Sequence, residues 1–406
     1  MRFGIYIRGV RSVQGAEKVA TNVAAGLAAR GHAVDFLVED DQGPLLEALA
    51  AQGVRVWPLR ARRFPFLRER GSQIAALLSA LASPEGWRRA GARGISALAK
   101  IVWSDDAPIA ALLDYVRSER PRAVLSFLNY PNFALMLASR LAPPGTRFLV
   151  SVRNHVSSSS ANARSRWNRS IPLLMQRCLH FADRIVAPSL GVAEDVALIT
   201  GVPRSRIEVI HNPLWPELPA LAEEPVSHPW LVDRRIPVIV AAGKLKPQKD
   251  FDTLLRAFQI ARAARPLRLI ILGDGDLLET LRARADELGV AADVDFPGYV
   301  TNPYPFFRRA SLYVLSSAWE GLPNVLIEAM ACGCPVVSTD CKAGPSEILA
   351  GGEYGRLVPV GAAEDLAKAM LETLDAPLPR ERLLARSRAF ALPLVVDAYE
   401  ALLTSV

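Results

Sequence analysis

The sequence predicts two α/β domains, each a doubly wound parallel sheet covered by helices. Its 406 residues, half of them hydrophobic, exceed the roughly 250–300 residues that one hydrophobic core serves. Strand patterns alternate with helix patterns from the start of the chain, which is typical of a mostly parallel sheet. This alternation stops in the proline-rich stretch 213–235, which indicates an interdomain connection, and restarts at Ile236. We therefore expect an N-terminal domain at 1–213 and a C-terminal domain at 214–389.

The first domain opens with a strand, a turn-rich loop, a helix and a second strand. RFGIYI is the expected first strand, and the helical pattern AEKVATNVAAGLAAR is followed by Gly31 at the position that often ends a helix. HAVDFLVED then alternates as a strand does. Further expected strands are GVRVWPL, AVLSFL, RFLVSV, RIVAPS and IEVIHN.

The second domain repeats the alternation of strands and helices. Its expected strands are IPVIVAAG, LRLIILGDGD, VDFPGYV, SLYVLSS, PVVSTD and GRLVPV, with helical segments between most of them. Two such domains usually hold a ligand between them, at the carboxyl ends of the strands.

Composition excludes several classes of protein. No apolar run approaches the length of a membrane-spanning helix, and the start MRFGIYIRGVRS lacks the pattern of a secretory signal. Four cysteines are too few for a disulfide framework, and C-x-C-x6-C without a nearby histidine is poor zinc spacing, so we expect ordinary packing and a cytoplasmic location.

Charge is distributed unevenly along the chain. Residues 1–215 hold 28 Lys and Arg against 16 Asp and Glu, whereas the remainder holds 20 against 25. The basic excess concentrates at 55–103, where aromatic side chains are interleaved. This combination suggests contact with an anionic membrane surface on the inner face of the cytoplasmic membrane. A solvated basic face is the alternative, and a nucleic-acid partner is not expected because no RNA- or DNA-binding motif accompanies the segment.

A lysine-rich loop follows the first strand of the second domain. The buried pattern ends at Gly243, and Lys244, Lys246 and Lys249 follow before a helix. Only five lysines occur after residue 215, so this concentration favours a diphosphate site over a solvated loop.

A glycine turn follows the next strand. LIILGDGD runs from an apolar strand into Gly273, Asp274, Gly275 and Asp276, and a helix comes next. Glycines allow the backbone to approach a ligand closely, and a helix start favours anions. The two aspartates could instead cap the helix.

Two acids eight positions apart occupy WEGLPNVLIEAMACG. We expect a helix that begins near Pro323 and Asn324, with Glu320 in the loop before it and Glu328 one turn inside. Asn324 and Glu328 then share a helix face. Carboxylates accept several hydrogen bonds and so bind vicinal hydroxyls, which sugars and riboses offer. A solvated Glu328 is the alternative, but its neighbours VLI and AMA leave little polar surface.

Together these motifs resemble the retaining glycosyltransferases of family GT4, which have the GT-B fold. The resemblance rests on Glu320 and Glu328 as an E-x7-E motif, on Lys244 and Lys249, on the GDGD turn, and on FPGYV at 296–300. In the N-terminal half it rests on Gly15-Ala16-Glu17 and on RIVAPSLGVAEDV followed by RIEVIHNPL. GT-B implies two Rossmann-like domains that face each other across a cleft and close around the donor. The stretch RAFALPLVVDAYEALL resembles the last helix of the family, so a helix at about 390–406 is expected to cross back to the first domain.

The resemblance implies a role for each matching residue. Lys244 and Lys249 would neutralise the donor diphosphate, Glu320 would hold the donor sugar, and Glu328 would bind the ribose hydroxyls. The family's histidine would lie in SVRNHVS, where Arg153, Asn154 and His155 compete; His155 is preferred. The implied catalytic residues are Glu320, Lys249, Lys244 and His155; the implied donor-binding residues are Gly15, Arg153, Gly243, Gly273, Asp274, Gly275, Tyr299, Gly321, Leu322, Pro323, Asn324 and Glu328.

The expected activity follows from this family. It is transfer, with retention, of a hexose or N-acetylhexosamine from a nucleotide sugar, UDP-linked by preference, to a glycan or polyprenyl-linked saccharide acceptor in surface-polysaccharide synthesis. No cofactor and no metal ion are expected. The alternative is an inactive glycan- or nucleotide-binding homologue, which would be expected to lose Lys249, Glu320 or Glu328.

Overall fold

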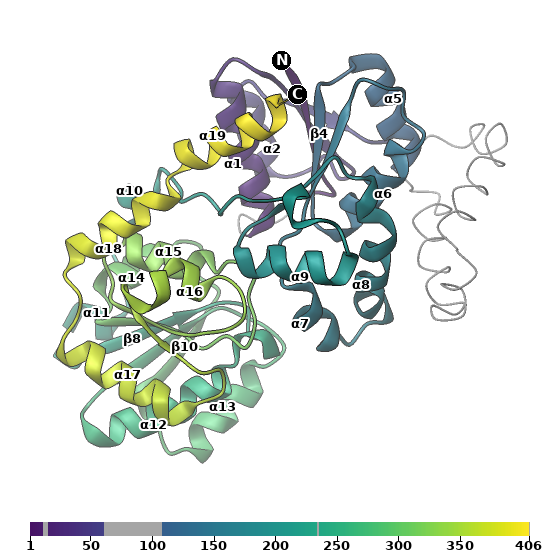
Figure 1. The fold of residues 1–406 in the computed structure, drawn as a ribbon. Coiled ribbons are helices and arrows are strands. Elements are labelled where there is room, and N and C mark those ends of the chain that lie inside the picture. The colour runs from purple at the N-terminus through teal and green to yellow at the C-terminus, as the bar shows by residue number, and fades with distance from the viewer. Residues whose placement is uncertain (11–14, 61–107, 234, 406) are drawn as a thin grey trace. The chain divides into compact units, whose positions relative to one another are not determined.

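The computed structural model describes residues 1–10, 15–60, 108–233 and 235–405 (Figure 1). These residues form two compact units. Unit 1 comprises Met1–His211 with Val395–Val406, and unit 2 comprises Asn212–Leu394. Each unit contains one parallel sheet with helices on both faces, so the predicted fold class is confirmed.

Unit 1 is built on a seven-stranded parallel sheet of order β3-β2-β1-β4-β5-β6-β7. Every strand predicted from the sequence is present. The strands are β1 (Arg2–Ile7), β2 (Ala33–Val38), β3 (Arg55–Pro58), β4 (Ala123–Phe127), β5 (Arg147–Ser151), β6 (Arg184–Ala187) and β7 (Ile207–Val209). The helices are α1 (Ala16–Ala29), α2 (Pro44–Ala51), α5 (Ile109–Glu119), α6 (Asn129–Ser139), α7 (Val156–Ala161), α8 (Arg166–Cys178), α9 (Leu190–Thr200) and α19 (Leu392–Thr404).

The C-terminal helix α19 packs within unit 1. Arg30, which follows α1, forms ion pairs with Asp397 and Glu400, and Glu400 also lies 2.7 Å from His32. Gly26 on α1 lies directly under Val396, because a Cβ added there would meet the valine side chain. Charge pairing and close helix packing therefore fix the last helix to the first.

Unit 2 is built on a six-stranded parallel sheet of order β10-β9-β8-β11-β12-β13. The strands are β8 (Val238–Ala242), β9 (Arg268–Leu272), β10 (Val294–Gly298), β11 (Leu312–Leu315), β12 (Val336–Thr339) and β13 (Arg356–Val358). The helices are α10 (Leu218–Ala222), α11 (Pro229–Asp233), α12 (Phe251–Ala264), α13 (Leu278–Glu287), α14 (Tyr304–Arg309), α15 (Asn324–Ala331), α16 (Pro345–Ile348), α17 (Ala363–Asp375) and α18 (Arg380–Ser387).

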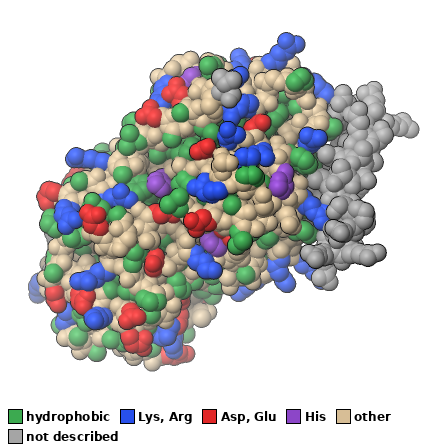
Figure 2. All heavy atoms as spheres, viewed as in Figure 1, with side chains coloured by type: hydrophobic (Ala, Val, Ile, Leu, Met, Phe, Trp, Pro, Cys, Tyr) green, Lys and Arg blue, Asp and Glu red, His purple; other side chains and the backbone are tan. Residues whose placement is uncertain are grey.

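The core of unit 2 forms because its central strands are apolar on both faces. Leu254 and Phe258 of α12 and Met370 of α17 pack with Ile239 and Ile271 in one buried cluster. Helices α12, α13 and α17 cover this face of the sheet, and α14, α15 and α16 cover the other (Figure 1). Acidic and basic side chains are mixed over the face of unit 2 that Figure 2 shows.

The stretch 213–235, expected to be a plain interdomain connection, has more structure than predicted. It carries the short helices α10 and α11, and Trp215, Leu218 and Leu231 are buried. The prolines interrupt the regular alternation, but these apolar side chains still pack on unit 2.

The cysteines and the membrane prediction can be compared with the described residues. All four cysteines are free and buried, and burial raises the pKa of Cys178 to about 12. Among the helices that the structure describes, none is both long and apolar enough to span a bilayer.

Most of the basic segment 55–103 lies outside the described residues. At its described start, Arg55 lies 2.6 Å from Asp35 and 2.7 Å from Glu119. Trp57 packs edge-on against Tyr115. These two side chains therefore contribute to the fold of unit 1.

Candidate functional site

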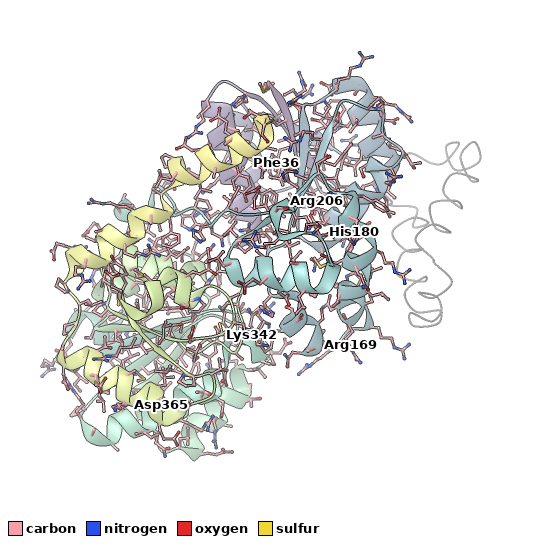
Figure 3. All side chains as sticks on the ribbon, in the orientation of Figure 1. Phe36, Arg169, His180, Arg206, Lys342 and Asp365 are labelled. Atoms are coloured by element: carbon pink, nitrogen blue, oxygen red, sulfur yellow. The ribbon has the colours of Figure 1, made fainter. Side chains whose placement is uncertain are left out.

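The candidate donor site lies at the carboxyl edge of the sheet in unit 2. Because all strands of this sheet are parallel, the loops that follow β8, β9, β11 and β12 emerge at this same edge. Three of them carry the lysine loop, the glycine turn and the first of the two acids. The loop after β12 adds Lys342, an exposed cation that the sequence analysis did not select (Figure 3).

The glycine turn after β9 packs on the lysine loop through backbone atoms alone. Gly273 has a φ of 136°, and a Cβ there would lie 2.1 Å from the Gly243 carbonyl oxygen. Gly275 has a φ of 150°, and its Cβ would lie 2.5 Å from the Leu245 oxygen. The Leu245 N–H also donates to the Asp274 carbonyl at 2.7 Å. Glycine is required here because two loops approach each other more closely than any side chain permits.

The alternative role of Asp274 and Asp276 as helix caps is wrong. Helix α13 begins at Leu278, its N-cap is Leu277, and no side chain bonds to its first turn. Both aspartates are exposed beside the lysine loop. They belong to the turn itself.

Lys249 and Glu320 form a nearly buried ion pair. Lys249 Nζ lies 2.7 Å from Glu320 Oε1, and the exposed fractions of the two side chains are 13% and 9%. The lysine reaches the acid by crossing directly over Gly243, where an added Cβ would lie 2.7 Å from Lys249 Cε. The two residues that the sequence analysis assigned to phosphate and to sugar are thus direct neighbours.

Two further side chains hold the Glu320 carboxylate, and the sequence analysis missed both. Ser317 Oγ donates to Oε1 at 2.7 Å, and Gln248 Nε2 donates to Oε2 at 3.2 Å. Gln248 also donates to the Trp319 carbonyl at 2.8 Å. A hydroxyl three residues before the acid and an amide beside the lysine are the only signals that the sequence offers for them.

Backbone hydrogen bonds join the loops that carry this pair. The Ala318 N–H donates to the Gln248 carbonyl at 2.9 Å, and Ser316 Oγ donates to the Lys249 carbonyl at 2.8 Å. Thr339 Oγ1, at the end of β12, donates to the Ser317 carbonyl at 2.6 Å. Three strand ends therefore fix the position of one carboxylate.

The other lysines increase the positive charge around the pair. Lys244 and Lys246 are exposed as whole residues. Neighbouring atoms still remove part of the water around the Lys246 ammonium, which lowers its pKa, and the nearby charge of Lys249 lowers it further. Such a group of cations is electrostatically unfavourable by itself and is relieved by an anion. A diphosphate provides this charge.

Glu328 lies where the sequence predicted it, inside a helix that begins at Asn324. It is 8% exposed, so the alternative of a solvated helix residue is wrong. Its Oε1 accepts a hydrogen bond from Trp215 Nε1 at 2.8 Å. Burial, and then the charge of Glu328, raise the pKa of Tyr304.

The turn Gly321-Leu322-Pro323 between the two acids is tightly packed. Leu322 is 6% exposed, and a Cβ on Gly344 would lie 2.6 Å from Pro323 Cδ. The loop after β12 thus packs against this turn through Gly344. Tyr299, after β10, is 54% exposed.

A cavity of about 560 Å³ opens beside this edge, between the start of α12 and α13. It is lined by Lys246, Asp250, Leu277, Thr280 and Arg284, among others, and by neither acid of the E-x7-E motif. The Lys249–Glu320 ion pair, rather than this cavity, identifies the candidate donor pocket.

In unit 1, Arg153 and Gly15 occupy different surroundings. Arg153 is 8% exposed, donates to Ser151 Oγ at 3.2 Å and lies over the ring of Phe127. Burial lowers the pKa of its guanidinium. Gly15 is exposed, caps the start of α1 with a φ of 68°, and has open space around its Cα.

His155 is built into the start of α7. Its ring accepts from the Ser158 N–H at 3.4 Å, and Nδ1 lies 3.6 Å from Asp195 Oδ2. Asp195 itself accepts from the N–H groups of Val156 and Ser157. His155 is therefore an N-cap held by a buried acid, a structural task that the sequence analysis did not foresee.

Comparison with known families agrees with this arrangement. Residues 236–376 match the family model described as glycosyl transferases group 1, and residues 14–213 match the glycosyl transferase 4-like domain. The chain belongs to these glycosyltransferases. The two matched ranges include every candidate residue of both units, and the predicted family is confirmed.

Two relatives of this glycosyltransferase are bacterial transferases. A Campylobacter jejuni N-acetylgalactosamine-N,N'-diacetylbacillosaminyl-diphospho-undecaprenol 4-alpha-N-acetylgalactosaminyltransferase is 29% identical over 68% of this chain and 74% of its own. The lipopolysaccharide core biosynthesis glycosyltransferase LpsE of Rhizobium meliloti is 36% identical over 42% of this chain and 50% of its own. The match therefore covers about three quarters of the first relative and half of the second.

Solved structures share the fold of the glycosyltransferase over its full length. Anabaena Alr3699/HepE, solved with UDP and glucose, has a TM-score of 0.75 at 17% identity and covers all of both chains. WaaG, a lipopolysaccharide-biosynthesis glycosyltransferase, has a TM-score of 0.65 at 14% identity, again over both full chains. At these identities the likeness shows the fold alone.

Within the described residues, no three His, Cys, Asp or Glu side chains are grouped as a metal ion would require. The acids of the site are instead paired with a lysine and a tryptophan.

Proposed function

We propose that this glycosyltransferase transfers a hexose or N-acetylhexosamine from a nucleoside-diphosphate sugar to a saccharide hydroxyl, with retention at the anomeric carbon. The observation that carries the proposal is the Lys249–Glu320 pair, whose atoms lie 2.7 Å apart and which joins the lysine loop to the loop before α15. In this proposal the lysine is the cation for the leaving diphosphate, and the neighbouring acid binds the donor sugar.

The proposed mechanism assigns the work to charges that are fixed before reaction. Lys244 and Lys249 stabilise the negative charge that develops on the leaving nucleoside diphosphate, while the acceptor hydroxyl attacks from the same face. Such prearranged electrostatic stabilisation is usually the largest contribution to the rate. Lys244 offers a point charge where an arginine would offer a bidentate contact.

Glu320 holds the donor sugar, and Glu328 binds the ribose hydroxyls. His155 and Arg153 are proposed to contact the reacting sugar or phosphate, and the Gly15 backbone is proposed to contact phosphate. We propose that no metal ion or cofactor takes part. The chemistry then depends on cationic side chains, chiefly Lys244 and Lys249, for charge neutralisation.

For the donor we favour a UDP-sugar, and for the acceptor a glycan or lipid-linked saccharide of surface-polysaccharide synthesis. The Campylobacter jejuni relative is named for a diphospho-undecaprenol acceptor, and the Anabaena structure contains UDP and glucose. These names support the proposal. The inactive-homologue alternative is less favoured because Lys249, Glu320 and Glu328 are all present and organised.

Donor hydrolysis tests the proposal without knowledge of the acceptor. The purified protein is incubated, with EDTA present, with UDP- and GDP-linked sugars, and the released nucleoside diphosphate is measured. We expect release with at least one donor, reduced at least about a hundredfold by Lys249→Ala or Glu320→Gln. The matched controls are Lys368→Ala and Glu364→Gln, which change exposed residues of α17. Release that survives both site variants would contradict the assignment.

We also propose that segment 55–103 attaches the enzyme to the inner face of the cytoplasmic membrane. The support is its basic and aromatic sequence, since residues 61–103 lie outside the described part of the structure. Flotation with anionic vesicles tests it: salt-sensitive binding is expected, and its absence would argue for a solvated basic face.

A further inference from the structure

The segment Asn212–Trp215, where the chain enters unit 2, is joined to the segment where it leaves. Leu214 forms a parallel bridge with Ala391, and its N–H donates to the Phe390 carbonyl at 2.6 Å. Phe390 is 1% exposed and Trp215 is 3% exposed. The entry segment is therefore anchored in the interior of unit 2.

This entry segment also holds the polar face of the E-x7-E helix. Trp215 Nε1 donates to Glu328 Oε1 at 2.8 Å. Asn212 Nδ2 donates to Asn324 Oδ1 and, at 3.4 Å, to the Leu322 carbonyl. Glu328 and Asn324, the two helix residues expected to bind the donor, thus each have a hydrogen-bond partner in one four-residue stretch.

The chemistry of the Trp215 contact restricts how Glu328 can present its oxygens. An indole N–H can only donate, and a carboxylate accepts up to about four hydrogen bonds. The Trp215 bond therefore fixes the direction of Oε1, and a carboxylate that accepts this bond can still accept from vicinal hydroxyls. Buried charge-assisted bonds are also shorter and stronger than neutral ones.

Packing of Trp215 by itself does not account for this contact. A backbone carbonyl would satisfy an indole N–H at far lower cost than a buried carboxylate, which loses its hydration. The desolvation cost of the buried carboxylate is explained if the carboxylate binds another partner and the tryptophan holds it in position.

We propose that Trp215 and Asn212 are positioning residues, which orient Glu328 and Asn324 for the ribose of the donor nucleotide. This inference rests on the proposed function, since it takes the role of Glu328 from it. Neither residue touches the reacting atoms. Their effect is on how well the site distinguishes a ribonucleotide from one that lacks a ribose hydroxyl.

The test compares the binding of UDP and 2′-deoxy-UDP by calorimetry, with GDP and 2′-deoxy-GDP as a second pair. The variant Trp215→Phe removes the N–H and keeps a ring. We expect it to weaken UDP binding about tenfold, because a hydrogen bond to a charged group contributes at least that factor. Binding of 2′-deoxy-UDP should change by less than about threefold, so that the preference for ribose is lost.

The control is Trp230→Phe, which changes a tryptophan of unit 2 that packs on His228 and Arg268. It should leave both affinities unchanged. If Trp215→Phe weakens both nucleotides equally, or neither, the inference is wrong and Trp215 only fills the core. If that variant does not fold, Asn212→Ala is measured in its place. We expect the same loss of ribose preference. An unchanged preference would contradict the inference. A wild-type protein that binds neither UDP nor GDP would instead contradict the proposed function.

Discussion

Lys249 Nζ lies 2.7 Å from Glu320 Oε1, and this pair joins the loop after β8 to the loop after β11. The two residues are 71 positions apart in the sequence. With the lysine paired to the acid, neither buried charge is left uncompensated when no donor is bound, which lowers the cost of keeping both in place. An incoming diphosphate would compete with the acid for the ammonium, so this contact connects the phosphate end of the site to its sugar end.

Ser317→Ala should lower turnover more than it lowers stability. The change removes one of three side-chain donors to the Glu320 carboxylate, so we expect kcat for donor hydrolysis to fall about tenfold, with a loss of about 1 kcal/mol in the free energy of unfolding. The control is Ser338→Ala, an equally buried serine that donates to the Thr339 carbonyl. Equal effects of the two changes on kcat would show that Ser317 serves the fold only.

Gly273→Ala should destabilise the protein strongly. The alanine would have to keep a φ of 136° and would place its Cβ 2.1 Å from the Gly243 oxygen, so the two loops must separate. We expect a loss of about 3 kcal/mol or more in the free energy of unfolding, measured by denaturant unfolding. Gly289→Ala is the control, because Gly289 has a φ of 67° and open space around it; it should cost about 1 kcal/mol. Similar losses for both would contradict the account of the glycine turn.

His155→Asn separates the capping role of His155 from its proposed catalytic role. Asparagine is a good N-cap, so α7 should remain in place and the melting temperature should change little. If His155 acts on the substrate, donor hydrolysis should still fall at least tenfold. His155→Ala should lower both stability and activity. Full activity in the asparagine variant would remove His155 from the catalytic set.

The attachment of α19 should weaken in acid. Hydrogen bonds from His32 and Arg30 lower the pKa of Glu400 below its ordinary value of 4.5. A carboxyl whose pKa is lower in the folded state contributes stability above its unfolded pKa and loses it as pH falls through the folded value. The melting temperature should therefore decrease as the pH is lowered below about 4.5, and this decrease should be smaller in Glu400→Gln. Glu364→Gln, which changes an exposed residue of α17, should keep the wild-type pH profile. Identical profiles for both variants would contradict the prediction.

The sequence predicted much of this fold because its signals are local. Apolar strands followed by glycine or polar loops marked each strand end, and Pro323-Asn324 marked the start of α15. The loops that carry Lys249 and Glu320 could be placed at one edge for the same reason, since parallel strands end together.

The partners of the site residues could not be predicted, because they depend on tertiary packing. In the sequence Ser317 and Gln248 are ordinary loop residues, and only the folded structure brings them to the Glu320 carboxylate. Trp215 lay in a stretch interpreted as a connection between domains, although a tryptophan among prolines needs a surface to pack on. His155 shows the opposite case, in which the residue type suggested chemistry and the packing added a capping role.

The central claim is that the carboxyl edge of the sheet in unit 2 binds a nucleotide sugar through Lys249, Glu320 and Glu328. A crystal structure of the protein with bound UDP or a UDP-sugar tests it most directly. The account predicts the diphosphate within hydrogen-bond distance of the Lys249 ammonium and the ribose hydroxyls on the Glu328 carboxylate, with Trp215 still bonded to that carboxylate. A nucleotide found elsewhere on unit 2, with the Lys249–Glu320 pair intact and Glu328 uncontacted, would contradict it.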